Sequence, residues 1–119
     1  LQSREVQVFV DRTVSPSYIE DVCDATVALL RIQPPDGLYH CVGSGHATWL
    51  GVATELAQRL GVTPVIRGIR LDDLDLPARR PKFCALSNQK LADVGAAMPT
   101  WQDALARYAE RRRQTARTS

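Results

Sequence analysis

Residues 38–61 read LYHCVGSGHATWLGVATELAQRLG, an apolar run, a glycine-rich turn and an amphipathic stretch in succession. The apolar run 38–42 predicts a short buried strand. Beyond the turn at 43–45, apolar residues return at the spacing of one helix face, which predicts a helix beginning near Trp49. Gly61 then stands where a helix ends on a left-handed residue. A strand, a tight turn and a helix in this order are typical of α/β proteins.

Toward the N-terminus a second strand and helix are predicted. Residues 6–10, VQVFV, alternate in the way of a half-buried strand. Ser17 and Glu20 fit a capping box, in which the serine oxygen accepts from the N3 amide and the glutamate reaches back. Apolar residues then recur at helical spacing, so a helix is expected over residues 18–31.

Toward the C-terminus the expected elements are shorter. Residues 62–66 could form a strand, which Pro64 confines to a sheet edge or to the strand's start. The following segments are expected to be a loop over 68–82, an extended segment over 83–86 and a helix over 87–94 capped by Ser87. Thr100 is the expected N-cap of a last helix. The strands are too few for a complete doubly wound sheet, so the order favours an α/β or α+β fold with few strands.

Composition fits one globular domain. The chain has 119 residues, 45% of them apolar and 24% charged, and a compact chain of this length has a radius of gyration of about 13–14 Å. No apolar run approaches the roughly 20 residues of a membrane helix, and no secretory signal pattern opens the chain. The three cysteines are widely spaced without a C-x-x-C pair, so reduced thiols in the cytoplasm are predicted.

The net positive charge comes from the C-terminal end. Residues 101–119 hold five arginines against one Asp and one Glu, a balance of +3, so the first hundred residues sum to −1 out of the total of +2. A nucleic-acid-binding domain would carry its basic residues on the folded body. We therefore predict a domain over residues 1–109, a disordered basic tail over 110–119, and no binding to nucleic acid or membrane.

Catalytic constellations are missing from the sequence. The Gly43-Ser44-Gly45 segment lacks the third glycine of the dinucleotide fingerprint, because Thr48 stands there, and a tight turn is expected instead. His40 is expected in the core and His46 on a loop, and neither has a partner at metal-ligand spacing, so no metal is predicted. No tyrosine has a lysine four positions further on, so the short-chain dehydrogenase pair Tyr-x-x-x-Lys is absent.

Two groups of residues are candidate ligand contacts. The turn Arg79-Arg80-Pro81 follows an acidic loop; its proline fixes the backbone, and a guanidinium offers a planar fork of donors suited to a diphosphate. Arg12, shortly before the Ser15-Pro16-Ser17-Tyr18 segment, is similar in kind. Exposed arginine pairs are common on protein surfaces, so a solvated turn is the alternative interpretation.

Short motifs along the whole chain together resemble a known family. They are Val10-Asp11-Arg12 with Ser15-Pro16-Ser17-Tyr18, Gly37-Leu38-Tyr39-His40 with Gly43-Ser44-Gly45 and Thr48-Trp49, Pro77-Ala78 with Arg80-Pro81, Leu86-Ser87 with Lys90-Leu91, and Met98-Pro99-Thr100-Trp101 with Ala104-Leu105. In this order and spacing, residues 6–109 resemble the C-terminal half of the dTDP-4-dehydrorhamnose reductase family, which are extended short-chain dehydrogenases. Each motif is short, and the resemblance rests on their collinearity.

The resemblance implies a fold and an activity. The fold class would be α/β, the C-terminal substrate-binding lobe of an extended short-chain dehydrogenase, with few short strands and about four helices and without most of the Rossmann domain. Complete members carry an N-terminal Rossmann domain that binds NADPH, or NADH, and holds the catalytic Ser/Thr, Tyr and Lys. They reduce dTDP-4-dehydro-6-deoxy-L-mannose (dTDP-4-dehydrorhamnose) to dTDP-L-rhamnose. The chain, which opens on Leu1, would be a piece of such a reductase, with no catalytic residue and no bound cofactor of its own.

The resemblance also implies where ligand contacts lie. Arg12, Ser15, Tyr18 and Arg80 would face the sugar nucleotide. Arg12 stands where many relatives carry Gln, a departure that bears on the sugar contacts. Both tryptophans match family motifs, but both fall on apolar helix faces, so they are expected in the core.

The expected partners follow from the same resemblance. They are a dTDP-sugar, the Rossmann domain of the parent protein and, because a half-protein exposes apolar surface, a second copy of the chain. The alternative is a non-catalytic relative that acts as a binding subunit, like the regulatory subunit of methionine adenosyltransferase. A Rossmann fingerprint with Tyr-x-x-x-Lys elsewhere in the gene product would favour the enzyme.

Overall fold

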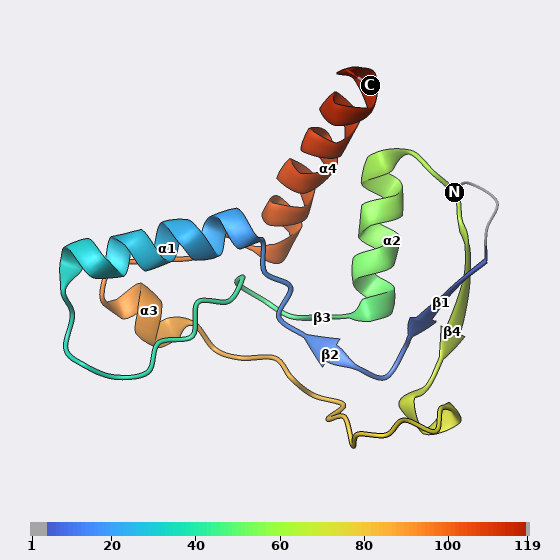
Figure 1. Ribbon diagram of the computed structural model, residues 1–119, viewed down its shortest axis with the longest axis horizontal. Coiled ribbons are helices and arrows are strands. Elements are labelled where there is room, and N and C mark those ends of the chain that lie inside the picture. Colours follow the sequence, from blue (N-terminus) through green and yellow to red (C-terminus); the bar gives the residue numbers. More distant parts are fainter. Residues whose placement is uncertain (1–4, 119) are drawn as a thin grey trace.

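The computed structural model describes residues 5–118, which form four α-helices, one short 3₁₀ helix and two small sheets (Figure 1). The elements in chain order are β1 (Glu5–Phe9), β2 (Thr13–Val14), α1 (Ile19–Ile32), β3 (Ala47–Thr48), α2 (Trp49–Leu60), β4 (Val65–Ile69), the 3₁₀ helix η1 (Leu71–Asp73), α3 (Gln89–Asp93) and α4 (Trp101–Thr118). The predicted α/β class with few short strands and about four helices is confirmed.

The first sheet is a parallel pair. β1 pairs with β4, with Phe9 opposite Ile69, and the N–H of Val10 extends the pairing to the Ile69 carbonyl at 2.9 Å. Parallel strands need a long crossover, and here it includes α1 and α2. α2 contacts both β1 and α4, so it lies between the sheet and the last helix (Figure 1). The carboxyl ends of β1 and β4 therefore meet at one edge, where Asp11 and Leu71 follow.

The second sheet lies at the middle of the molecule. β2 pairs antiparallel with β3, placing Thr13 opposite Thr48. On its other side, the N–H of Thr13 donates to the Lys82 carbonyl at 2.7 Å and the N–H of Cys84 donates to the Thr13 carbonyl at 2.8 Å. We call β2, β3 and residues 82–84 the central ladder. It joins three segments that are distant in sequence.

Apolar side chains are buried in separate groups. Ala25 of α1 packs with Leu91 of α3 and with Ala96 and Met98 of the connection to α4. A second group lies along one face of α4, where Trp101 is 9% exposed, as expected for a core residue. Both groups are small, and the first joins α1, α3 and the connection to α4.

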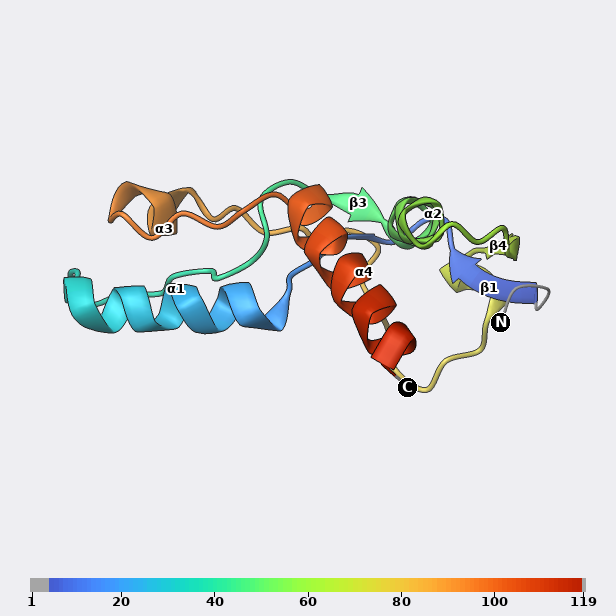
Figure 2. The ribbon, with the colours of Figure 1, turned by 90° about the horizontal axis from the view of Figure 1, so that it is seen from above.

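The molecule is flat. Its radius of gyration is 16.7 Å and its extents are 49 × 41 × 21 Å, so the expected compact shape of about 13–14 Å is wrong. The thin profile is plain in Figure 2, where α1 and α3 lie on one side of α4 and the parallel sheet on the other. The expectation assumed one shared core, whereas large apolar side chains such as Ile19 and Leu30, 73% and 72% exposed, remain at the surface.

Several predicted helix ends are confirmed. Gly61 ends α2 with φ 70°, and its N–H donates to the carbonyls of Ala57 and Gln58. The Thr100 hydroxyl accepts from the N–H of Asp103 at 3.2 Å at the start of α4. These ends need only residues close in sequence, which explains why sequence reasoning found them.

The predicted capping box at the start of α1 is wrong. Tyr18, not Ser17, is the N-cap residue, and no side chain caps the helix. The Ser17 hydroxyl accepts from the N–H of Gly43 at 2.9 Å and donates to the Ser15 carbonyl at 3.0 Å. A distant backbone amide has therefore taken the acceptor that the capping box required. Glu20 pairs elsewhere, as described below.

Two segments expected to be strands differ from their prediction. Residues 38–42 form no strand, because Tyr39 and Cys41 pack against the α1–α3 group instead of pairing with a strand edge. The strand expected over residues 62–66 is β4, which begins after Pro64 and extends further into the expected loop because it pairs with the whole of β1.

The expected short helix over 87–94 is smaller than predicted. α3 covers Gln89–Asp93 and its N-cap is Asn88. The Ser87 hydroxyl still accepts from the N–H of Gln89, at 3.2 Å. The Asn88 side-chain amide does not cap the helix; it donates to the Val42 carbonyl and to the Ser44 hydroxyl, at 2.9 Å each.

The basic C-terminal end differs from the expected disordered tail. α4 continues through residue 110 as far as Thr118. Arg111 pairs with Glu20 of α1, and Arg113 donates to the Arg59 carbonyl at the end of α2. The contact of Arg113 with the last turn of α2 is of the kind by which arginine stabilises a helix C-terminus. Through these two arginines, this part of α4 contacts both α1 and α2. Within the described range, no helix is both long and apolar enough to cross a membrane.

Candidate functional site

The central ladder brings two of the predicted ligand residues to neighbouring positions. Arg12 and Ser15 flank β2, one at each end. The Ser15 hydroxyl accepts from the N–H of Leu86 at 2.8 Å and faces its carbonyl at 3.4 Å. Because both hydrogen-bonding directions of the hydroxyl are taken by the backbone, Ser15 fixes the 82–86 segment and has little left for a ligand.

Unlike the Ser15 hydroxyl, the side chain of Arg12 has a donor without a partner among the described residues. It is half-buried, its Nε is shielded from solvent, and that Nε has no hydrogen-bond partner among the described residues. Its carbonyl accepts from the N–H of Trp49 at 3.3 Å, which holds the backbone. A buried guanidinium N–H without an acceptor is costly. The Arg12 Nε is therefore an inward-facing donor without an acceptor among the described residues.

Arg80 lies on the long connection between η1 and the ladder. It helps to line a hollow of about 290 Å³ together with Arg79, Asp72 and Asp75. Within the described part of the chain, Arg80 makes no hydrogen bond or ion pair, and residues 72–80 are exposed throughout. Lys82, two positions further on, pairs with Asp72 at 3.1 Å. The guanidinium is therefore free for an anion.

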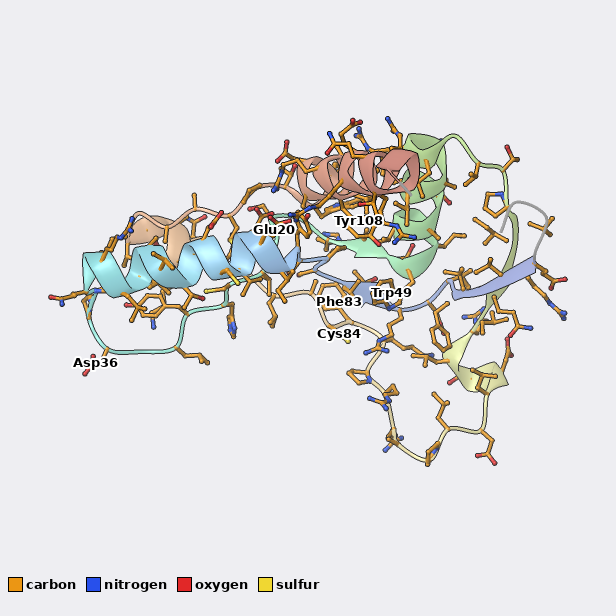
Figure 3. All side chains as sticks on the ribbon, turned by 45° about the horizontal axis from the view of Figure 1, so that its top comes forward. Glu20, Asp36, Trp49, Phe83, Cys84 and Tyr108 are labelled. Atoms are coloured by element: carbon orange, nitrogen blue, oxygen red, sulfur yellow. The ribbon has the colours of Figure 1, made fainter. Side chains whose placement is uncertain are left out.

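Tyr18 belongs to a different part of the molecule. Its hydroxyl donates to Glu20 and accepts from Arg111 at 3.2 Å. The hydrogen bond from Tyr18, together with the charge of Arg111, holds the pKa of Glu20 below its ordinary value. The ring of Tyr18 meets Tyr108 edge-on at 6.1 Å, and Glu20 and Tyr108 lie together at this junction in Figure 3. The Tyr18 hydroxyl is therefore already hydrogen-bonded to Glu20 of α1 and Arg111 of α4.

Beside Tyr18 the surface is hollowed and apolar. A hollow of about 360 Å³ lies between the 16–19 segment and α4, lined by Trp101, Leu105 and Tyr108 among others. It contains none of the other three predicted ligand residues. The structure thus places Arg12 and Ser15 at the two ends of β2, Arg80 on the adjoining connection, and Tyr18 beside α4.

Sequence reasoning missed an aromatic surface at the ladder. Phe83 stands opposite Thr13 in the ladder and is 67% exposed. The ring of His46 meets it edge-on at 6.2 Å. Trp49, expected in the core, is 39% exposed (Figure 3). Its helical spacing placed it on an apolar face, but it is the first residue of α2, where fewer neighbours cover a side chain.

The Gly-Ser-Gly segment is a structural junction, not a phosphate loop. The Ser44 hydroxyl donates to the Met98 carbonyl at 2.7 Å, and its backbone pairs with Pro99 and Trp101. α2 begins only at Trp49, so these residues do not form its first turn. His40 is half-buried outside any strand. Among residues 5–118 there is no cluster of three or more His, Cys, Asp or Glu suited to a metal ion.

These features define a class of protein. Among residues 5–118 the parallel sheet has only two strands, β1 and β4, so this part of the chain has an α/β fold with too few strands for a complete doubly wound domain. The family model described as the RmlD substrate binding domain matches residues 1–114. The chain belongs to this family.

Curated relatives agree with the family match. The chain is 28% identical over 109 residues to the spore coat polysaccharide biosynthesis protein SpsK of Bacillus subtilis, covering 92% of this chain and 38% of the relative. It is 30% identical over 112 residues to the dTDP-4-dehydrorhamnose reductase of Escherichia coli, covering 85% and 38% respectively. The chain therefore spans less than two-fifths of the length of these relatives.

Solved structures show the same fold. A dTDP-4-dehydrorhamnose reductase from Clostridium acetobutylicum superimposes with a TM-score of 0.81 at 23% identity, over 89% of this chain and 38% of that one. The reductase of Bacillus anthracis, solved in complex with NADP, gives a TM-score of 0.77 at 24% identity, over 87% and 37%. The resemblance predicted from the sequence motifs is confirmed at the level of family and fold.

Proposed function

We propose that residues 1–109 are the sugar-nucleotide-binding lobe of an NADPH-dependent 4-ketoreductase that converts dTDP-4-dehydrorhamnose to dTDP-L-rhamnose. The observation that carries this proposal is the family match over residues 1–114, which the reductase of Escherichia coli supports at 30% identity. The relatives named above include no regulatory subunit, so they give no support to the binding-subunit alternative. A cytoplasmic location and self-association remain predictions.

The lobe's own residues would bind and orient the substrate. Arg80, exposed on its loop and without a partner among residues 5–118, suits the diphosphate because a guanidinium can donate two parallel hydrogen bonds to phosphate oxygens. Arg12, directly before β2, would bring a second positive charge to the ligand. Ser15 would act through the backbone of Leu86. Tyr18 would support the lobe through α4.

The cofactor is assigned outside these residues. The sequence holds no dinucleotide fingerprint and no Tyr-x-x-x-Lys pair, so these residues do not fit NADPH. NADPH would supply a hydride from elsewhere in the reductase. Holding the substrate in a reacting geometry is nevertheless a large contribution to rate, about 7–11 kcal/mol at best.

If this chain binds the substrate and other residues of the reductase bind NADPH, an activity assay should distinguish the two parts. The 119-residue chain alone should not oxidise NADPH in the presence of dTDP-4-dehydrorhamnose, whereas the complete gene product should, with absorbance at 340 nm as the readout. Turnover by the chain alone would contradict the division. An inactive gene product that lacks the Tyr-x-x-x-Lys pair would favour the binding-subunit alternative.

Replacing Arg80 by alanine tests the binding site itself. The affinity of the complete gene product for dTDP should fall by about 1.5–3 kcal/mol, the range for a hydrogen bond to a charged group. Arg112→Ala removes the same charge from the exposed face of α4 and should leave affinity unchanged. Calorimetric titration with dTDP measures both. Equal affinities for the wild type and Arg80→Ala would exclude Arg80 from the site.

A further inference from the structure

The carboxylate of Asp11 has an unusual set of partners. Asp11 follows directly after the pairing of β1 with β4, and its side chain is 13% exposed. Both carboxylate oxygens accept from the backbone N–H of Leu71, at 3.1 and 3.3 Å. The two residues are 60 positions apart, so this contact joins two loops, not neighbouring turns.

The register of the parallel sheet explains the contact. Phe9 is opposite Ile69, so Asp11 and Leu71 occupy equivalent places just beyond the carboxyl ends of the two strands. Leu71 is 7% exposed and opens η1. The N–H of Arg70 donates to the Asp73 carboxylate at 3.0 Å, which fixes the same turn from the other side. The start of the connection to the ladder is thus anchored at Asp11.

Asp11 also faces the far end of that connection. The ammonium of Lys82 lies 4.0 Å from Asp11 and 3.1 Å from Asp72. The Lys82 carbonyl accepts from the N–H of Thr13 in the central ladder. One nearly buried carboxylate therefore contacts both ends of the 71–82 connection, and we call these contacts the Asp11 clasp.

The clasp matters because the middle of the connection is exposed. Residues 72–83 are all exposed, and Arg79 and Arg80 lie in this stretch. Each residue of a free loop has a backbone entropy that must be lost before its side chain can be presented in one place. Fixing the two ends shortens the free segment and limits the positions that Arg80 can reach.

We infer that Asp11 is a positioning residue, which sets the place of Arg80 by clasping the two ends of the 71–82 connection. The inference rests on the proposed function, in which Arg80 meets the diphosphate. A direct contact between Asp11 and the ligand is disfavoured, because both oxygens are engaged and a carboxylate repels a diphosphate. Asp11 thus acts on the ligand through the loop.

Three variants of the complete gene product test the clasp. Asp11→Ala removes both contacts, Asp11→Asn keeps an acceptor for the Leu71 amide but loses the charge facing Lys82, and Asp36→Asn removes one charge from an exposed turn at the distant end of the molecule (Figure 3). Trypsin cleavage after Arg79 reports the order of the loop, because a more mobile loop is cleaved faster. The Arg80-Pro81 bond is not cleaved, since a proline follows the arginine. Titration with dTDP reports binding.

Asp11→Ala should be cleaved after Arg79 about tenfold faster than the wild type, and its dissociation constant for dTDP should rise about tenfold. Asp11→Asn should give smaller changes in both, and Asp36→Asn none. In an Arg80→Ala background, Asp11→Ala should no longer weaken binding, because the loss passes through Arg80. A general loss of structure would instead weaken binding in both backgrounds.

The two readouts separate the possible failures. Unchanged cleavage in Asp11→Ala would overturn the clasp, whatever the binding result. Faster cleavage with unchanged dTDP affinity would overturn its role in positioning Arg80. If the wild type does not bind dTDP, the proposed function fails, but cleavage still decides whether Asp11 holds the loop. Should Asp11→Ala not fold, Asp11→Asn is compared with the wild type instead, and an unchanged cleavage rate in Asp11→Asn would then overturn the clasp.

Discussion

Replacing Arg107 by alanine is expected to lower the free energy of unfolding by about 3 kcal/mol. The guanidinium of Arg107 forms two hydrogen bonds to the Asp21 carboxylate, at 2.8 and 2.7 Å, and the Asp21 side chain is only 7% exposed. These bonds raise the pKa of Arg107 above its ordinary value. Breaking a buried pair costs about 3–5 kcal/mol, but Arg107 is 41% exposed, so the lower end applies.

Most of this loss comes from the charge left behind on Asp21. Adding Asp21→Asn to Arg107→Ala should therefore recover about 1 kcal/mol, since a neutral amide needs no counter-charge. Arg112→Ala, on the exposed face of the same helix, is the matched control and should change stability by less than about 0.5 kcal/mol. Urea denaturation followed by circular dichroism measures all three. If Arg107→Ala lowers the free energy of unfolding by no more than Arg112→Ala does, the ion pair between Arg107 and Asp21 does not stabilise the fold.

Two glycine-to-alanine substitutions should have opposite effects. A Cβ at Gly43 would lie 2.2 Å from the Pro16 carbonyl oxygen, a backbone atom that cannot swing aside. Gly43→Ala should lower the free energy of unfolding by about 3 kcal/mol, at the upper end of the range for overpacking. It should also disturb the hydrogen bond from Gly43 to Ser17.

Gly51→Ala is the control for Gly43→Ala. Its Cβ would meet only side-chain atoms at 3.5 and 3.7 Å, which is ordinary contact, and Gly51 lies within α2. Alanine is the better helix former by about 1 kcal/mol, so this variant should be neutral or more stable. Melting temperatures of the pair measure the difference. Equal melting temperatures would show that the 16–18 segment yields to the added methyl group.

The elements that could be predicted are those specified by neighbours in sequence. α2, the glycine that ends it and the Thr100 cap all depend on residues within four positions of each other. The capping box failed because the amide of Gly43, 26 residues away, competes for the Ser17 hydroxyl. The helical C-terminal end was missed for a related reason, since Arg111 and Arg113 pair with other helices.

The candidate site was predictable only in its residue types. An arginine next to a proline suggested an anion contact at Arg80, and the structure leaves that guanidinium unpaired among the described residues. Nothing in the sequence showed that the Tyr18 hydroxyl is held by α1 and α4, or that Ser15 bonds to Leu86. The Asp11 clasp depends on the register of two distant strands, which a single sequence does not reveal.

The small thickness of the molecule, 21 Å, has a consequence for how it tolerates mutation. A helix with its side chains is about 10–12 Å across, so the protein is at most two helices deep. The buried group at α1 and α3 does not include the parallel sheet, so loosening that group is expected to leave the sheet in place. Damage from a single core substitution should consequently remain regional, and amide protons in different junctions should exchange with solvent at independent rates.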